Sequence, residues 1–142
     1  MPTDPHIRRA NDGDWPRIRE IRSAVRENQL SDPSLVTPED FRWFTDGPGI
    51  WLWQDDERIN GFSASDTRDG SIWALFVDPA HEGRGIGSAL LQAALTILRE
   101  AGHRTATLST GPDTRASRFY RTAGWSEDGS TTKGELRFRL PL

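Results

Sequence analysis

Three glycines at alternating positions form the segment of this sequence whose spacing is best suited to chemistry. Gly83, Gly85 and Gly87 follow an apolar run that ends at Val77, and an apolar-periodic stretch begins directly after them. A helix that begins here presents free backbone N–H groups and the positive end of its dipole, and both favour an anion. Because glycine has no side chain, these amides can approach a phosphate closely. The segment therefore predicts a phosphate-binding loop at a helix N-terminus.

Two other phosphate motifs do not fit this segment. The dinucleotide fingerprint G-x-G-x-x-G fails because Ser88 and Leu90 stand where the third glycine would have to be. The P-loop requires a lysine after its last glycine, and none is present. A glycine-rich turn that binds no ligand is the remaining alternative.

A second segment combines helix signals with the one tyrosine of the chain. Asp113 is expected to cap a helix that carries Ala116, Phe119 and Tyr120 on its apolar face, and Gly124 is expected to end it. Packing in the core is therefore one role open to Tyr120.

The elements that position these segments follow from capping residues and periodicity. We expect a first helix capped by Asp14 that extends to Val25, and a second opened by Thr37 and ended by Gly47. Further helices are expected over residues 85–101 and 113–123, and a loop over residues 28–36. Strands are expected over residues 6–9, 50–54, 58–65, 71–77, 104–109 and 135–140.

The order of these elements predicts a mixed α/β fold. Short spacings between residues 50 and 77 imply antiparallel hairpins. The strand–helix–strand run over residues 71–109 implies a parallel, right-handed crossover within a mostly antiparallel sheet. A length of 142 residues suits one domain, so we expect residues 1–142 to share a single core.

Composition excludes several classes of protein. The absence of cysteine excludes disulfides, thiolate metal sites and a cysteine nucleophile, and the three histidines lack metal-ligand spacing, so no metal is expected. A net charge of −3 with both signs mixed along the chain argues against a nucleic-acid partner. No apolar stretch approaches the roughly 20 residues that span a bilayer, and the N-terminus has no signal-peptide core. A cytoplasmic protein with no membrane partner is expected.

Two motifs of this chain resemble the signature of the GNAT superfamily of N-acetyltransferases. The first is Leu75–Pro79 followed by Glu82–Gly87, and the second is Asp113-x-x-Ala116-x-x-Phe119-Tyr120-x-x-x-Gly124-Trp125. They occur in the family's order, about one strand apart. The resemblance implies the acyl-CoA N-acyltransferase fold, in which helices flank a mostly antiparallel twisted sheet that includes a parallel β-α-β unit for coenzyme A.

The resemblance also implies acetyl-coenzyme A as co-substrate. The glycine loop would wrap its pyrophosphate, and its pantetheine arm would lie in a wedge where the strands ending near Val77 and Ser109 splay apart. The implied cofactor-binding residues are Leu75, Phe76, Val77, Glu82, Gly83, Arg84, Gly85, Ile86, Gly87, Ser88, Asp113, Ala116 and Phe119.

Two positions depart from the family's usual pattern. The family usually has Gln or Arg where this chain has Glu82, and we expect the Glu82 carboxylate to point to solvent while neighbouring amides contact phosphate. The family often has Asn, in contact with pantetheine, where this chain has Asp113. Asp113 would either take that role or serve only as the helix cap.

Acetyl transfer to an amine requires a deprotonated nucleophile, a stabilised oxyanion and a protonated leaving thiolate. The resemblance implies a main-chain N–H near Phe76 or Val77 as the oxyanion donor and Tyr120 as the acid for the coenzyme A sulfur. A phenol with a reference pKa of about 10 holds its proton at pH 7 and can donate it to a forming thiolate. Core packing stays open as the other role of Tyr120.

The residues that would serve the acceptor are less defined. Ser109 could relay a proton through water or simply bond to backbone, and Trp43 and Trp73 could line a cleft for an aromatic or cationic amine or simply pack. The candidate bases are acids near the acceptor loops whose alternative is a solvated surface position: Glu27, Asp66 and Asp69.

We therefore expect an N-acetyltransferase that acetylates a primary amine of a small molecule, with a homodimer as one option for its assembly. A protein or peptide amine is an alternative acceptor, and a non-catalytic sensor of acyl-coenzyme A is an alternative function. Tyr120 at the position of the thiolate acid favours catalysis over sensing.

Overall fold

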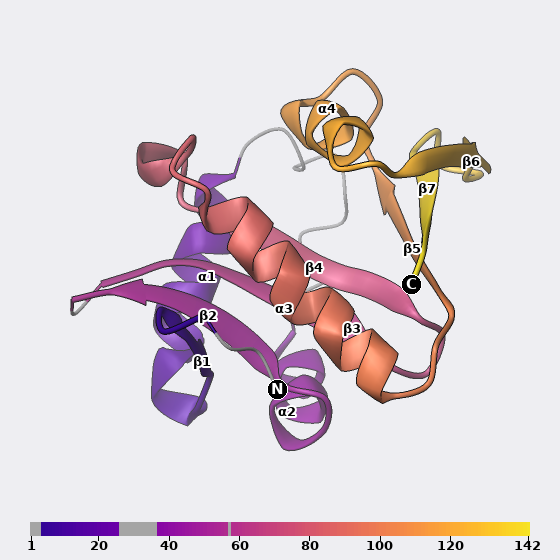
Figure 1. Ribbon diagram of the computed structural model, residues 1–142. Coiled ribbons are helices and arrows are strands. Elements are labelled where there is room, and N and C mark those ends of the chain that lie inside the picture. The colour runs from indigo at the N-terminus through magenta and orange to yellow at the C-terminus, as the bar shows by residue number, and fades with distance from the viewer. Residues whose placement is uncertain (1–3, 26–36, 57) are drawn as a thin grey trace.

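Seven strands form one mixed sheet in the computed structural model, which describes residues 4–25, 37–56 and 58–142 (Figure 1). The strand order is β1-β2-β3-β4-β5-β7-β6, and every neighbouring pair is antiparallel except β4 and β5, which are parallel. The expected mixed α/β sheet is confirmed, whereas the loop expected over residues 28–36 lies outside the described residues. The strands are β1 (Ile7–Arg9), β2 (Ile50–Asp55), β3 (Arg58–Asp66), β4 (Ser71–Val77), β5 (Thr105–Thr110), β6 (Ser126–Ser130) and β7 (Leu136–Pro141).

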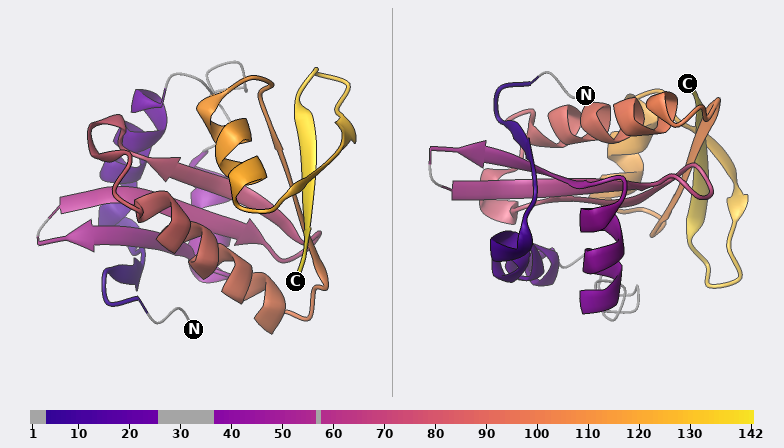
Figure 2. Two further views of the ribbon diagram at one scale, coloured as in Figure 1. Left: turned by 45° about the horizontal axis from the view of Figure 1, so that its top comes forward. Right: turned by 90° about the horizontal axis from the view of Figure 1, so that it is seen from below.

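Helices cover both faces of this sheet. In the right panel of Figure 2, α1 and α2 lie below the sheet and α3 lies above it. No helix of the described chain is both long enough and apolar enough to cross a membrane. The helices are α1 (Trp15–Ala24), α2 (Pro38–Asp46), α3 (Ile86–Glu100) and α4 (Arg115–Thr122), with short 3-10 turns η1 (Asp12–Asp14) and η3 (Pro79–His81).

Of the three predicted helix caps, Thr37 is confirmed, whereas Asp14 and Asp113 do not cap α1 and α4 with their side chains. Thr37 caps α2 as predicted, because its hydroxyl accepts a hydrogen bond from Asp40 N at 3.1 Å. Asp14 stands at the N-cap position of α1 but makes no side-chain cap there, since its carboxylate accepts hydrogen bonds from the Arg8 guanidinium at 2.9 and 3.0 Å and from Asn11 N at 2.8 Å. The bond from Asn11 N belongs to the capping box of η1. Arg8 belongs to the preceding strand β1, so helix periodicity and capping patterns do not predict its bonds to Asp14.

The predicted cap of α4, Asp113, is also wrong. Thr114 caps the helix by accepting from Ser117 N at 3.1 Å, and the Ser117 hydroxyl accepts from Thr114 N at 3.1 Å. Asp113 cannot form this reciprocal pair, because Ala116, three residues after it, has no side-chain acceptor. Asp113 instead precedes the cap, exposed and with a φ of 56°.

Two apolar layers hold the helices to the sheet. One lies under α1 and α2 and includes Ile18, Phe44 and Phe62. The other joins α3 and α4 to β5 and β7 and includes Leu95 and Tyr120. The helix over residues 85–101 was predicted from the apolar stripe that forms this second layer, and α3 confirms it within one residue at each end.

Helix α3 packs directly against the backbone and short side chains of β3, because the residues of β3 that face it are small: Gly61, Ser63 and Ser65. The Ser63 hydroxyl donates to Leu90 O at 2.9 Å, and the Ser65 hydroxyl donates to Ala94 O at 2.6 Å, both fully buried. A Cβ added to Gly61 would lie 2.8 Å from Leu90 Cδ1. These contacts fix the distance between the helix and the sheet, and so the position of the loop that precedes the helix.

Replacing Gly61 with alanine should therefore destabilise the fold by about 1–3 kcal/mol, the usual cost of overpacking a core. The added methyl would also meet Phe76 O at 2.8 Å, and backbone cannot move aside cheaply. Urea denaturation followed by circular dichroism measures the loss. Gly13→Ala is the control, because its methyl would meet only the Asn11 side-chain oxygen, at 3.2 Å. Equal stability changes in the two variants would contradict the close packing.

Candidate active site

Strands β4 and β5 diverge and leave a wedge in the sheet. In the described strands their register pairing is limited to Ser71 with Thr107 at the start of β4. On its other edge, β5 pairs with β7 along its whole length, from Thr105 with Pro141 to Thr110 with Leu136. The divergence is visible in the left panel of Figure 2. The C-terminal part of β4 consequently has a free edge toward the wedge.

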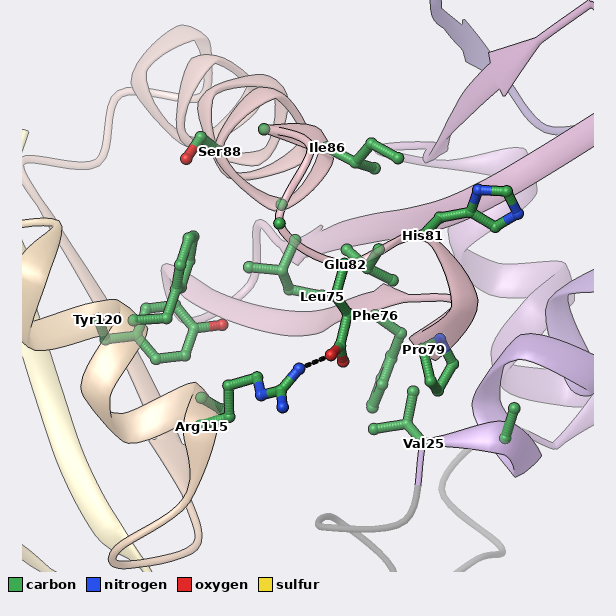
Figure 3. Close-up of a pocket in the computed structure, with 17 residues that line it drawn as sticks. Val25, Leu75, Phe76, Pro79, His81, Glu82, Ile86, Ser88, Arg115 and Tyr120 are labelled. Atoms are coloured by element: carbon green, nitrogen blue, oxygen red, sulfur yellow. Dashed lines mark ion pairs between the residues drawn. The ribbon is translucent and has the colours of Figure 1, made fainter.

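A pocket of about 600 Å³ occupies this wedge (Figure 3). Its walls come from the end of β4, the loop after it, the first turn of α3, one face of α4 and the end of α1. The lining residues are Ala24, Val25, Leu75, Phe76, Val77, Pro79, His81, Glu82, Gly83, Gly85, Ile86, Gly87, Ser88, Arg115, Ala116, Phe119 and Tyr120. The residues for which the resemblance implies cofactor binding therefore line this one cavity, except for Arg84 and Asp113.

The N-terminus of α3 opens into this pocket. Its N-cap is Gly85, which has a φ of 81° and provides no side-chain cap for the first-turn N–H groups. A Cβ added to Gly83 or Gly85 would meet no atom within 4 Å, so the space beside these residues is open. Free amides, the helix dipole and open space together suit the binding of an anion such as phosphate.

The loop between β4 and α3 is tied to the rest of the fold by Asp78. Arg17 on α1 donates to Asp78 Oδ2 at 2.7 Å and, through Nε, to Ile59 O at 2.8 Å. Asp78 Oδ1 accepts from Ala80 N at 3.0 Å, which starts the turn η3. Sequence reasoning missed this anchor; an aspartate before a Pro79 turn was the one local signal for it.

Tyr120 both packs in the core and faces the pocket. Its ring lies 5.3 to 6.1 Å from the rings of Phe119, Trp125 and Phe138, and the residue is only 6% exposed. Figure 3 shows its hydroxyl pointing toward the pocket. Burial raises the pKa of the Tyr120 phenol far above its usual value, so the hydroxyl stays protonated. The two roles considered for Tyr120 are thus compatible.

The expectation for Glu82 is met only in part: the residue is exposed, but its side chain lines the pocket instead of pointing away from it. Its carboxylate forms an ion pair with Arg115, which begins α4 on the other side of the pocket (Figure 3). Sequence reasoning did not single out Arg115, because only the tertiary fold brings α4 opposite the loop between β4 and α3. Arg84, expected to bind cofactor, turns away from the pocket toward Asp55 at 3.5 Å and His81 at 2.8 Å.

The family model described as Acetyltransferase (GNAT) family matches residues 15–125. This chain belongs to the GNAT family of acetyltransferases. A mycothiol acetyltransferase from Beutenbergia cavernae is 34% identical over 114 residues, which are 76% of this chain and 38% of that protein. The chain spans less than half the length of the curated relatives that it matches first.

Solved structures share the fold over nearly the whole chain. A Mycobacterium tuberculosis protein in complex with CoA has a TM-score of 0.76 at 20% identity, covering 97% of this chain and 99% of that chain. A Salmonella typhimurium protein with acetyl-CoA has a TM-score of 0.68 at 18% identity, covering 96% of this chain and 92% of that chain. These likenesses show the acyl-CoA N-acyltransferase fold that the resemblance implied.

The two candidate bases among the described residues, Asp66 and Asp69, do not line the pocket of this GNAT chain. Asp66 pairs with Ser71 in the β3–β4 register, so it lies at the opposite end of β4 from Val77 and the loop that leads to α3. Arg68 donates to its carboxylate at 2.8 and 2.9 Å, and these bonds lower the pKa of Asp66 despite its burial. Asp69 accepts hydrogen bonds from Ser71 N and Oγ. Glu27 lies outside the described residues.

The other predicted acceptor residues lie away from the pocket lining as well. Trp73 is a β-bulge, because Ala64 pairs with Ala74 and Ser65 pairs with Ile72, leaving Trp73 between them. The bulge turns its ring onto Phe44, with centroids 4.1 Å apart. Trp43 packs edge-to-face on Phe44 and lies beneath the Arg68 guanidinium, 3.7 Å from its ring centroid. Ser109 is exposed on β5 opposite Arg137.

The anchoring role of Asp78 predicts a pH-dependent contribution to stability. Burial by itself would raise the pKa of Asp78, but the hydrogen bonds from Arg17 and Ala80 N outweigh it and lower that pKa. The carboxylate therefore stabilises the fold above the unfolded pKa of about 3.9, and this contribution is lost as the pH falls through the folded pKa.

Asp78→Asn should accordingly lower the free energy of unfolding at pH 7, and the difference from the unaltered protein should shrink below about pH 4. Urea denaturation across pH 3 to 7 measures it, with the exposed Asp128→Asn as control. A difference that stays constant over this pH range would show that the ion pair does not act as described.

Proposed function

We propose that this chain is an N-acetyltransferase that transfers the acetyl group of acetyl-coenzyme A to a primary amine of a small molecule. The observation that carries the proposal is one pocket that joins the open N-terminus of α3 to the buried hydroxyl of Tyr120. Membership of the GNAT family and curated relatives named mycothiol acetyltransferases support acyl transfer and a small acceptor.

Two parts of coenzyme A, the pyrophosphate and the pantetheine arm, each have a matching feature in the wedge. The pyrophosphate fits the amides of the loop around Gly83, Gly85 and Gly87 at the start of α3. The pantetheine arm contains two amide groups, and the free edge of β4 beyond Ser71 offers backbone partners for them. An extended chain that adds to a free strand edge is a common mode of recognition. The thioester would then lie deep in the wedge.

The reaction forms a C–N bond and breaks a C–S bond. The amine nitrogen attacks the thioester carbon, and the oxyanion is stabilised by a main-chain N–H near Phe76 or Val77 on β4. As the C–S bond breaks, Tyr120 gives its proton to the sulfur and the attacking nitrogen loses a proton to water. The phenolate then regains a proton from water, so the products are the amide, the thiol and the enzyme in its starting protonation state. The burial that raises the pKa of Tyr120 also disfavours a thiolate beside it, so a desolvated sulfur can accept that proton.

Coenzyme A should bind with micromolar affinity, and Gly87→Leu should weaken binding by at least about 100-fold, or roughly 2.7 kcal/mol. A Cβ at Gly87 would lie 3.7 Å from Phe119, an ordinary contact, so the variant should fold while its side chain fills the phosphate space. Isothermal titration calorimetry measures both affinities. Gln92→Leu, an exposed position on the same helix, is the control and should bind normally. No binding heat from the unaltered chain at millimolar coenzyme A would overturn the proposed function.

Tyr120→Phe should lower turnover by about 10²–10⁴-fold, the usual contribution of a positioned general acid. The ring contacts with Trp125 and Phe138 remain, so the melting temperature and coenzyme A affinity should change little. Mass spectrometry of a panel of small amines and peptides incubated with acetyl-coenzyme A identifies the acceptor and measures turnover. A folded variant with unaltered turnover would remove Tyr120 from the mechanism, and acetylation of peptides alone would overturn the small-molecule acceptor.

A further inference from the structure

An ion pair crosses the pocket between the two elements that frame it. Glu82 belongs to the phosphate loop, and Arg115 is the first residue of α4 (Figure 3). Both side chains line the pocket, and they are 32% and 65% exposed. Because water reaches both groups, the pair contributes little to stability and can be broken at small cost.

The negative charge of Glu82 opposes the binding of a negatively charged pyrophosphate in the same pocket. Glu82 directly precedes Gly83, one of the residues whose amides would attract a pyrophosphate, and its side chain lines the same pocket. The negative charges of the carboxylate and of a bound pyrophosphate would repel each other, so either the carboxylate moves away or a positive group compensates its charge. Arg115 is the group now compensating it.

Arg115 is suited to hold the phosphate itself. A guanidinium presents a planar fork of donors that matches phosphate oxygens, and such charge-assisted bonds are stronger than neutral ones. Among the described residues that line the pocket, it supplies the only guanidinium. Arg84, in the loop, is turned toward Asp55, and Arg118, one turn further along α4, lies outside the lining. A pyrophosphate also carries more charge than one carboxylate and would compete well for Arg115.

We infer that Arg115 is a phosphate-binding residue of this pocket and that Glu82 occupies it in the absence of ligand. When coenzyme A binds, Arg115 exchanges the Glu82 carboxylate for a pyrophosphate oxygen. The inference deepens the proposed function and rests on it. Glu82 then acts as an internal competitor that lowers the affinity for phosphate-bearing thioesters.

A different arrangement would leave Arg115 on Glu82 and away from the ligand, where it would only neutralise the carboxylate. The two arrangements predict opposite couplings between the residues. With exchange, loss of Arg115 weakens binding more when Glu82 is absent, because the full arginine–phosphate interaction is then lost. With neutralisation alone, loss of Arg115 weakens binding only when Glu82 is present.

Calorimetric titration with coenzyme A at one fixed ionic strength, over a double-mutant cycle of Glu82→Gln and Arg115→Gln, separates these arrangements. We expect Glu82→Gln to tighten binding several-fold. Arg115→Gln should weaken binding by about tenfold or more in the Glu82→Gln background, and by a smaller factor in the unaltered background. Arg118→Gln removes the same charge from the same helix outside the pocket and should leave the affinity unchanged.

The outcomes also separate this inference from the proposed function. If the unaltered chain binds coenzyme A but Arg115→Gln costs nothing in the Glu82→Gln background, the exchange is refuted and the proposed function stands. If Arg118→Gln weakens binding as much as Arg115→Gln, the effect is one of net charge and the exchange is again refuted. If the unaltered chain gives no heat with coenzyme A, both the function and the inference fail.

Discussion

The divergence of β4 from β5 is the constraint on which the rest of the site depends. Strand β5 has two edges, and β7 occupies one of them along its whole length while Thr107 meets β4 only at Ser71. A free strand edge inside a sheet normally needs a partner. The wedge therefore creates both the space for an extended ligand and the backbone groups to hold it, and α3 and α4 contribute their residues around this space.

Different interactions hold helix α3 against the sheet and the charged side chains at the pocket. Ser63 and Ser65 bond to α3 carbonyls in fully buried surroundings, where an unmade hydrogen bond costs about 1–3 kcal/mol. The Glu82–Arg115 pair is exposed, and such pairs contribute about 0–1 kcal/mol. The helix is thus held rigidly against the sheet while the side chains at the pocket remain free to change partners.

Local pattern was enough to predict the elements and part of the site. The apolar stripe of α3, the glycines before it and the placement of Tyr120 among apolar residues all depend on near neighbours in the chain. The family could be identified for the same reason, since its two motifs are short. The cap of α4 shows the limit of such reasoning: Asp113 was predicted, but the adjacent Thr114 forms the cap, because the Ser117 hydroxyl three residues after it accepts a hydrogen bond from Thr114 N.

By itself, the sequence determined the family, the phosphate-suited loop at Gly83–Gly87 and the order of the helices and strands apart from β6. That strand was not predicted, because its residues are exposed throughout and carry no apolar alternation. Only the tertiary structure decided which charged groups meet, because Arg17 with Asp78 and Glu82 with Arg115 join segments far apart in the chain. It also decided that Asp66 lies away from the pocket, at the far end of β4. The physical reason is range: periodicity and capping act over a few residues, whereas ion pairs and pocket walls depend on how separate elements pack.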